Sequence, residues 1–543
     1  MALNIPQSSK TRTWLFFFIA CILGALLYGP HLNAPLVFDD IAYFGSNYAS
    51  RCGIGFHGDI PRWWPCWTFA VPRVLLGEDV LHFFRLGNLI LHILTVNALF
   101  IFLRQLFTTL IPTYKTSSYS IDAMAAFAAM VFLLHPVAVY GTAYLVERSI
   151  LMATLFSLLM LSFHLRGMES RNPVWFLLAV LSCYFALYSK ENSVMIPFVA
   201  LLLTIALRDR QLPWRQLAFT FLAYAFLSIS VVYQVKSVIA TSYEPEAADI
   251  LAQLASESKL PHNLYLVSVL SQSLLFFKYV FLWFVPITSW MSIDIQKSII
   301  DTTASPLYWL STAVFVAWCL AGFMLVWRQG MHALLGFAML APALLYATEF
   351  ASIRIQEPFV LYRSYLWAPA LFTVTPLLLQ KLRPAHILLI SIVIAIVFAR
   401  LSENRLEVFS SDYALWNEAV MHSERDKVQT PMLARQYFNR GLNYFKGRNS
   451  KAAIADFNRA LNCSPRYLLA LNGKGRALMN IGQYDAAKSC YEQSLIIKPD
   501  YVPTLLGHAQ ACIKLGDNAC AKRDIQKSCD LGYFFACSTL KKL

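Results

Sequence analysis

Long apolar segments recur through the first 400 residues and constrain the fold more than any other feature. Hydrophobic residues make up 57% of the 543 residues and charged residues 14%, and the mean hydropathy is +0.51. These values predict a membrane protein rather than a soluble domain. A helix needs about 20 apolar residues to cross about 30 Å of hydrocarbon. About eleven segments approach that length: 14–32, 83–103, 123–144, 149–165, 173–188, 193–207, 216–233, 307–327, 331–347, 364–379 and 385–399.

The first apolar segment follows Lys10 and Arg12 and looks like a signal peptide. It lacks a small-residue cleavage site before Pro30, so we expect a retained anchor with its N-terminus inside.

A further apolar segment, 265–287, is interrupted by Lys278 and ended by Pro286. It either crosses the membrane or forms an interfacial or re-entrant segment. If it does not cross, the short loops rich in Lys and Arg all fall on the inner face, as the positive-inside rule requires, and everything after Ala399 lies outside. If it crosses, Arg328 falls outside and the tail inside. We favour the first topology.

Two adjacent carboxylates, Asp39 and Asp40, follow the first apolar segment. Ionised carboxylates are costly to desolvate, so such a pair faces open water or serves a site that carries its own positive charges. In the favoured topology, mixed-charge clusters fall on the same outer face, which predicts a site there. A helix-capping role for each pair is the alternative. The other members are Glu147, Arg148, Lys190, Glu191, Asp294, Arg354, Glu357, Tyr362 and Arg363.

The tail repeats with a period of 34 residues. Small and aromatic residues recur at matching positions, which is the tetratricopeptide pattern of paired helices. We therefore expect an all-α chain: a membrane body over 1–400 with its first outer loop at 33–82, a linker helix region at 401–433 and three repeats over 434–543. Such arrays form a groove that binds peptides. The matching positions are Gly441, Tyr444, Ala453, Phe457, Ala460 and Pro465, then Gly475, Leu478, Ala487, Tyr491, Ser494 and Pro499, and in a third copy Ala509, Cys512, Ala521, Ile525 and Ser528.

Six of the 11 cysteines lie in this tail. Cys512 and Cys520 are eight positions apart, as are Cys529 and Cys537, and a helical hairpin brings such thiols together. Buried free thiols are the alternative in a reducing compartment. The run Cys529-Asp530-Leu531-Gly532 with Cys537 resembles Sel1-like repeats, whose cysteines pair at this separation, and this implies an oxidising space. Cys52 and Cys66 form another candidate pair. No two-pair Cys or His spacing that would predict a zinc site is present.

The order of motifs resembles the C-type integral-membrane glycosyltransferases (GT-C), and among them the O-mannosyltransferases that carry tetratricopeptide repeats. Residues 38–45 resemble the acidic first-loop motif of these enzymes. Val139, Tyr140 and Gly141 depart from the His-Thr-Glu of the eukaryotic relatives, so mannose is not supported as the sugar. The other matching motifs are His135-Pro136, Arg148 with Leu151, Ala153 and Phe156, Ser189-Lys190-Glu191, Pro286 with Ser292 and Asp294, and Glu357 with Tyr362 and Arg363.

The resemblance implies transfer of a sugar from a polyprenyl-phosphate donor to Ser or Thr hydroxyls of an exported protein held by the repeats. Asp39 is then the general base, and Asp40 orients it or binds the acceptor. Arg148, Lys190 and Arg363 bind the donor phosphate. Glu147, Glu191, Asp294, Glu357, Tyr362 and His135 support the site, and neither metal nor cofactor is expected. The expected location is a bacterial inner membrane, with the site and the repeats in the periplasm.

The net charge is +14. We expect these positive charges to bind anionic lipid headgroups and not nucleic acid, since Lys and Arg lie at segment ends and no groove-reading motif is present. Two other functions remain open: the same fold modifying a glycan or lipid of the envelope, and a non-enzymatic membrane receptor or assembly scaffold.

Overall fold

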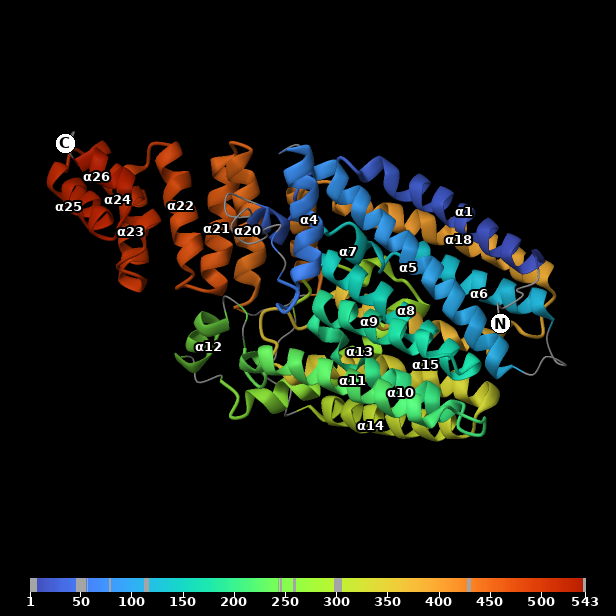
Figure 1. Ribbon diagram of the computed structural model, residues 1–543. Helices are drawn as coiled ribbons and strands as arrows, with labels where there is room; N and C mark the ends of the chain where they lie inside the picture. The colour runs from blue at the N-terminus through green and yellow to red at the C-terminus, as the bar shows by residue number, and fades with distance from the viewer. Residues whose placement is uncertain are drawn as a thin grey trace.

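The computed structural model describes residues 7–44, 55, 57–77, 80–111, 117–242, 244, 247–256, 260–296, 305–426 and 431–540. Over these residues the chain is all-α, apart from an isolated β-bridge between Ile295 and Phe359. A body of long helices carries a stack of paired helices at one end (Figure 1).

Within the described residues, eight helices of the body are long and apolar enough to cross a membrane. Four further apolar helical segments are shorter. Together they cover the eleven predicted segments and 265–287, but length and composition do not decide how many cross. The eight are α1 (Gln7–Tyr28), α5 (Leu81–Leu110), α8 (Arg148–Ser170), α11 (Trp214–Gln234), α13 (Leu264–Phe284), α14 (Pro306–Trp327), α15 (Gly330–Tyr346) continued by the turn Ala347–Ala351, and α18 (Pro384–Val408). The shorter ones are α6 (Ser118–Leu133), α9 (Pro173–Ser189), Glu191–Ala206 with α10 (Ile196–Ala206), and Ala368–Leu379 with α16 (Ala368–Leu371) and α17 (Thr375–Leu379).

Segment 123–144 is not a single helix, contrary to the prediction. α6 ends at Leu133, and α7 (Val139–Thr142) follows after a turn. Pro136 lies in that turn, and a proline disfavours helical geometry in the residue before it and has no backbone N–H to donate. The turn places His135 inside the body.

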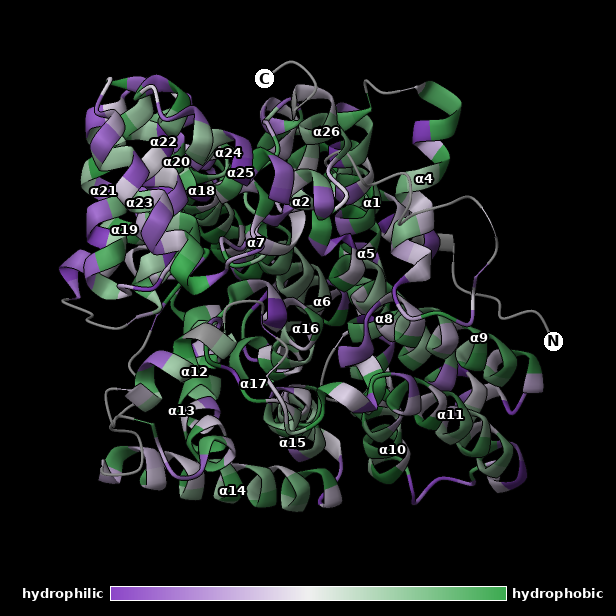
Figure 2. Cartoon of the chain, turned by 90° about the vertical axis from the view of Figure 1, so that its left-hand side faces the viewer, coloured by the Kyte–Doolittle hydropathy of each residue, from purple (hydrophilic) through white to green (hydrophobic). Residues whose placement is uncertain are grey.

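The outer faces of several body helices are apolar and exposed, as a lipid-facing surface requires. Phe226 on α11, Leu320 on α14 and Ile396 on α18 are all well exposed. Figure 2 shows hydrophobic residues along the body helices and a more polar mixture on the repeats. The helices α1 and α6 start at the end of the body remote from the repeats (Figure 1), and near those starts Asp122 lies 2.7 Å from both Arg12 and Arg104.

The chain before and after α13 lies near the same part of the structure, the start of the repeats. At its start, Val267 of α13 packs in one cluster with α12 (Ala247–Ser256) and with Met432, which directly precedes α20 (Leu433–Lys446). After it, Asp294 pairs with Arg435 of α20 at 3.0 Å. The start of α13 and the chain that follows it therefore both lie beside the N-terminal end of α20.

The tail is a stack of helix pairs, α20 with α21 (Ser450–Cys463), α22 (Leu468–Asn480) with α23 (Tyr484–Ile497), and α24 (Val502–Lys514) with α25 (Asn518–Asp530), followed by α26 (Phe534–Leu540). A Cβ on Gly475 would lie 2.7 Å from the Tyr491 ring, so glycine is needed for the close approach of α22 and α23. α18 continues past residue 400 to Val408, and α19 (Asp412–Arg425) packs on α20.

Candidate functional site

A cavity of about 540 Å³ lies where the body meets the first repeat. The first loop contributes Phe38 and Asp39, the loop after α15 contributes Arg354 and Glu357, and helix α20 contributes Arg435. Loops of the membrane body and a repeat helix therefore form one concave site.

The first loop is fastened to α19. The backbone N–H of Phe38 donates to Asp412 Oδ1 at 3.1 Å, and the Phe38 ring packs edge-on against Trp416 at 5.1 Å. Phe38 has a φ of +51°, a left-handed conformation that is unfavourable for a bulky residue and needs such support. The short helix α2 (Asp39–Tyr43) starts directly after it.

The two predicted catalytic carboxylates have different environments. Asp39 is accessible to solvent on the cavity wall. Asp40 is fully buried and accepts hydrogen bonds from the backbone N–H groups of Leu145 (3.3 Å) and Val146 (2.9 Å). Asp40 thus fastens α2 to the turn before α8, while Asp39 alone of the two faces open space.

Both carboxyl groups hold their protons more tightly than usual. Desolvation by the cavity wall raises the pKa of Asp39 to about 6, and the negative charge of Glu357 raises it further, whereas the positive charge of Arg435 lowers it. Burial raises the pKa of Asp40 to about 7, although the Val146 backbone bond and Arg85 oppose this. A carboxylate with a pKa near 6 is ionised at neutral pH and is a stronger base than an ordinary aspartate.

Beside Asp39 runs a chain of alternating arginines and carboxylates. Arg435 of α20 contacts Asp294 at 3.0 Å and Glu357 at 3.1 Å. Arg363 contacts Glu357 at 3.5 Å and Glu349 at 3.3 Å. Arg354 contacts Glu349 at 3.2 Å. Although burial opposes it, Arg435 and Arg363 lower the pKa of Glu357, so this network holds ionised groups in a largely buried place.

Lys190 and Glu147, predicted separately, form a buried ion pair at 2.5 Å. Lys190 Nζ also lies 5.0 Å from the centre of the Tyr362 ring. Tyr362 in turn packs near Tyr144, which packs on Phe38. The Lys190–Glu147 ion pair therefore lies behind the part of the cavity wall that carries Asp39.

The structure does not bring Arg148 or His135 to the cavity. Arg148 is buried and donates to Asn88 Oδ1 (2.8 Å) and to the carbonyl oxygens of Thr68 (3.0 Å) and Phe84 (2.5 Å), which ties α4 (Trp63–Leu76) and α5 to α8. His135 Nε2 lies 3.2 Å from the carbonyl oxygen of Trp283. Both residues hold helices together at these contacts.

A second cavity, of about 390 Å³, has a polar head and an apolar side. Its polar residues include Arg62, Glu191 and Arg354, and α11 lines its apolar side. Arg62 Nε donates to Glu191 Oε2 at 2.9 Å. Arg354 lines this cavity as well as the Asp39 cavity.

An apolar groove of about 450 Å³ between α10 and α11 continues from this second cavity, because Val194 and Val232 line both. Phe198, Leu201 and Ile229 lie along it. We call the two cavities together the α10–α11 groove. A groove with an apolar length and a charged head suits an amphiphile with an anionic headgroup.

The sequence motifs include neither Arg435 nor Glu349, and they assign no role to Arg354. Arg354 stands three positions before Glu357, so its charge was a usable signal. Arg435 lies within the repeats, where polar residues are common, and its position in the sequence carries no sign that it turns toward the body.

The predicted cysteine pairs of the tail are joined as disulfides, Cys512 with Cys520 and Cys529 with Cys537, with Cα–Cα distances of 5.9 Å and 4.8 Å. The third candidate pair involves Cys52, which lies outside the described residues.

Comparison with known proteins identifies one repeat of the tail. Residues 469–501, which cover α22 from its second residue onward and all of α23, match the tetratricopeptide repeat model. No curated protein matches the chain at a significant level. The chain thus carries a tetratricopeptide repeat beside a body of membrane-length helices.

Proposed function

We propose that the chain is a membrane glycosyltransferase of GT-C type that moves a sugar from a polyprenyl-phosphate carrier to hydroxyl groups of an exported protein. The observation that carries this proposal is the place of Arg354, which lines both the α10–α11 groove and the Asp39 cavity. A donor lipid in the groove would place its phosphate at Arg354, next to the cavity where Asp39 meets an acceptor.

The chemistry follows from these positions. Asp39 takes the proton of the acceptor hydroxyl as that oxygen attacks the anomeric carbon, and the sugar–phosphate bond breaks on the opposite side, giving inversion. Negative charge grows on the departing phosphate. Arg354 and Arg363, which share Glu349, supply positive charge for it.

The repeats are expected to hold the acceptor protein. Phe438 of α20 and Leu469 of α22 line the same cavity as Asp39, so a peptide that enters from the repeats reaches the proposed base. We place this face outside the membrane, with α13 as a re-entrant segment. The return of the chain from Val267 to Asp294 onto α20 supports that assignment, as does the position of Arg12 and Arg104 at the opposite end.

The test measures donor binding and transfer separately, with the full chain in nanodiscs. Polyprenyl phosphate without sugar serves as the binding probe. Ala225→Trp fills the α10–α11 groove and should weaken binding at least tenfold, whereas Leu222→Trp, on the lipid-exposed face of the same helix, should not. Equal binding by both variants would contradict the groove assignment.

Transfer is measured as O-linked glycopeptides of exported proteins, by mass spectrometry of cells with and without the intact gene. Asp39→Asn should reduce them by about 10² or more, and Asp59→Asn, an exposed acid of the same loop, should not. Normal protein glycosylation with Asp39→Asn would exclude the base assignment. Loss of sugar from an envelope glycan or lipid instead would favour that class of acceptor.

A further inference from the structure

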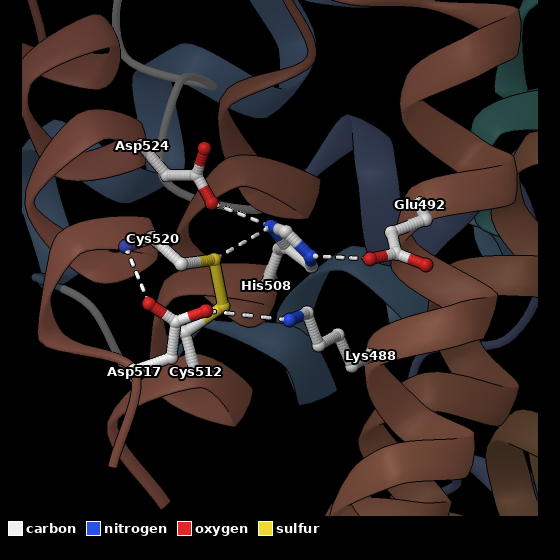
Figure 3. Close-up of a disulfide and its surroundings, with 7 residues drawn as sticks. All are labelled: Lys488, Glu492, His508, Cys512, Asp517, Cys520 and Asp524. Atoms are coloured by element: carbon white, nitrogen blue, oxygen red, sulfur yellow. Dashed lines mark hydrogen bonds and ion pairs between the residues drawn. A yellow bond between two sulfur atoms is a disulfide. The ribbon is translucent and has the colours of Figure 1, made fainter. Parts of the chain in front are cut away.

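Four potential metal ligands surround one point between α24 and α25, far along the tail from the Asp39 cavity. They are His508, Cys512, Cys520 and Asp524, all buried, and their ligand atoms lie within 4.8 Å of one another. Figure 3 shows the Cys512–Cys520 disulfide with His508 and Asp524 beside it. His508 Nδ1 lies 2.5 Å from Asp524 Oδ2 and 3.8 Å from Cys520 Sγ.

The donor set suits zinc. Zinc in proteins takes four ligands among cysteine, histidine and aspartate, with bonds of about 2.0 to 2.3 Å in a tetrahedron. Ligand atoms in such a tetrahedron lie about 3 to 4 Å apart, and the four ligand atoms here all lie within 4.8 Å of one another. Small side-chain rotations would bring the four atoms into that geometry once the two sulfurs are separate.

A carboxylate also lies near the other side of the histidine ring. The other ring nitrogen, His508 Nε2, lies 3.6 Å from Glu492 Oε1 of the neighbouring helix α23. Metal-binding histidines usually give their second N–H to a carboxylate, which fixes the tautomer and makes the first nitrogen a better ligand. Glu492 is placed for that role, with Nδ1 directed at the cysteines and Asp524 (Figure 3).

We propose that this cluster is a zinc site when the Cys512–Cys520 disulfide is reduced. A dithiol reductant supplies two electrons and two protons and becomes a disulfide itself, which leaves two thiols on the chain. On binding Zn²⁺ both thiols release their protons, and the metal takes two thiolates, His508 Nδ1 and an Asp524 oxygen. The proposal does not depend on the glycosyltransferase assignment.

The consequence is that α24 and α25 stay joined in either redox state. A covalent bond joins them when the cysteines are oxidised, and a metal bridge replaces that bond when they are reduced. Zinc binding to a site formed only in the folded state stabilises that state.

The test uses the full chain in detergent, reduced with a dithiol under nitrogen and freed of the reductant. Co²⁺ should then give a thiolate-to-cobalt charge-transfer band with the spectrum of a tetrahedral site at one equivalent, and Zn²⁺ should displace it. The oxidised chain should give neither. Zn²⁺ should also raise the melting temperature of the reduced chain and leave that of the oxidised chain unchanged.

Variants assign the ligands. His508→Ala and Asp524→Asn should each lower the affinity of the reduced chain for Zn²⁺ at least tenfold. The double variant Cys529→Ser/Cys537→Ser removes the other disulfide and serves as the matched control, because it should keep the cobalt band. The proposal fails if the reduced wild-type chain gives no band, if His508→Ala keeps it at full strength, or if the control variant abolishes it.

Discussion

Arg435 Nη2 lies 3.0 Å from Asp294 Oδ1, so a repeat helix and a loop of the membrane body share a buried ion pair. The same guanidinium contacts Glu357 through Nη1 at 3.1 Å. One arginine thus balances two carboxylates from different loops, and it lines the cavity that holds Asp39.

Replacing this arginine should release the repeats from the body. Arg435→Ala leaves Asp294 and Glu357 buried without their shared cation, a change that costs about 3 to 5 kcal/mol. We expect a lower melting temperature in detergent and faster proteolysis between the two parts. Arg459→Ala is the control, since Arg459 is exposed and its partner Asp456 keeps Arg440; it should cost about 0 to 1 kcal/mol. Equal effects of the two variants would contradict the role given to Arg435.

The rate of sugar transfer should depend on pH through Asp39. The reactive form is the carboxylate, and the pKa is raised to about 6, so the rate should fall as the pH drops through about 6, well above the usual range of an aspartate. The measurement is kcat/KM against pH in nanodiscs. A rate that stays flat down to pH 5 would show that Asp39 is not the base.

Asp40 should affect stability and its dependence on pH. Its pKa is raised from 3.8 to about 7 in the folded chain, so the folded state binds the proton more tightly than the unfolded state does. The resulting stabilisation is complete below about pH 4 and is lost as the pH rises through 7. Asp40→Asn cannot titrate, so the denaturation midpoint should change less between pH 5 and 7.5 than in the wild type. An unchanged pH dependence would exclude this assignment.

Lys190 and Glu147 should behave as a coupled pair. Lys190→Ala leaves Glu147 buried and unpaired, and should cost about 3 to 5 kcal/mol. Adding Glu147→Ala should recover part of that loss, and a double-mutant cycle on thermal stability measures the coupling. If polyprenyl phosphate binding falls in Lys190→Ala and stays low in the double variant, Lys190 contacts the donor as the resemblance implies. If binding recovers with stability, its role is to position the Asp39 wall.

The class of fold and the nature of the tail follow from the sequence alone. Apolar segments of membrane length and a 34-residue period are local patterns, and each helix or helix pair is set by residues close in sequence. The eight-residue spacing of Cys512 and Cys520 is local too, since it lies within one helical hairpin. This is why the tail cysteine pairs were predicted correctly.

Which charged residues meet was decided only by the tertiary structure. Arg435 and Asp294 are separated by 141 positions, and no local pattern shows that a repeat helix folds back onto a loop of the body. His508 and Asp524, two of the proposed zinc ligands, lie on one helical hairpin, and they meet because α24 packs on α25. Burial also separates neighbours: Asp39 and Asp40 are adjacent in sequence and alike in chemistry, yet backbone packing leaves one on a cavity wall and encloses the other. Periodic patterns in the sequence reveal the helices and their repeats, because each helix is set by residues close in sequence. A functional site depends on long-range packing, which buries a few polar groups from distant parts of the chain next to one another.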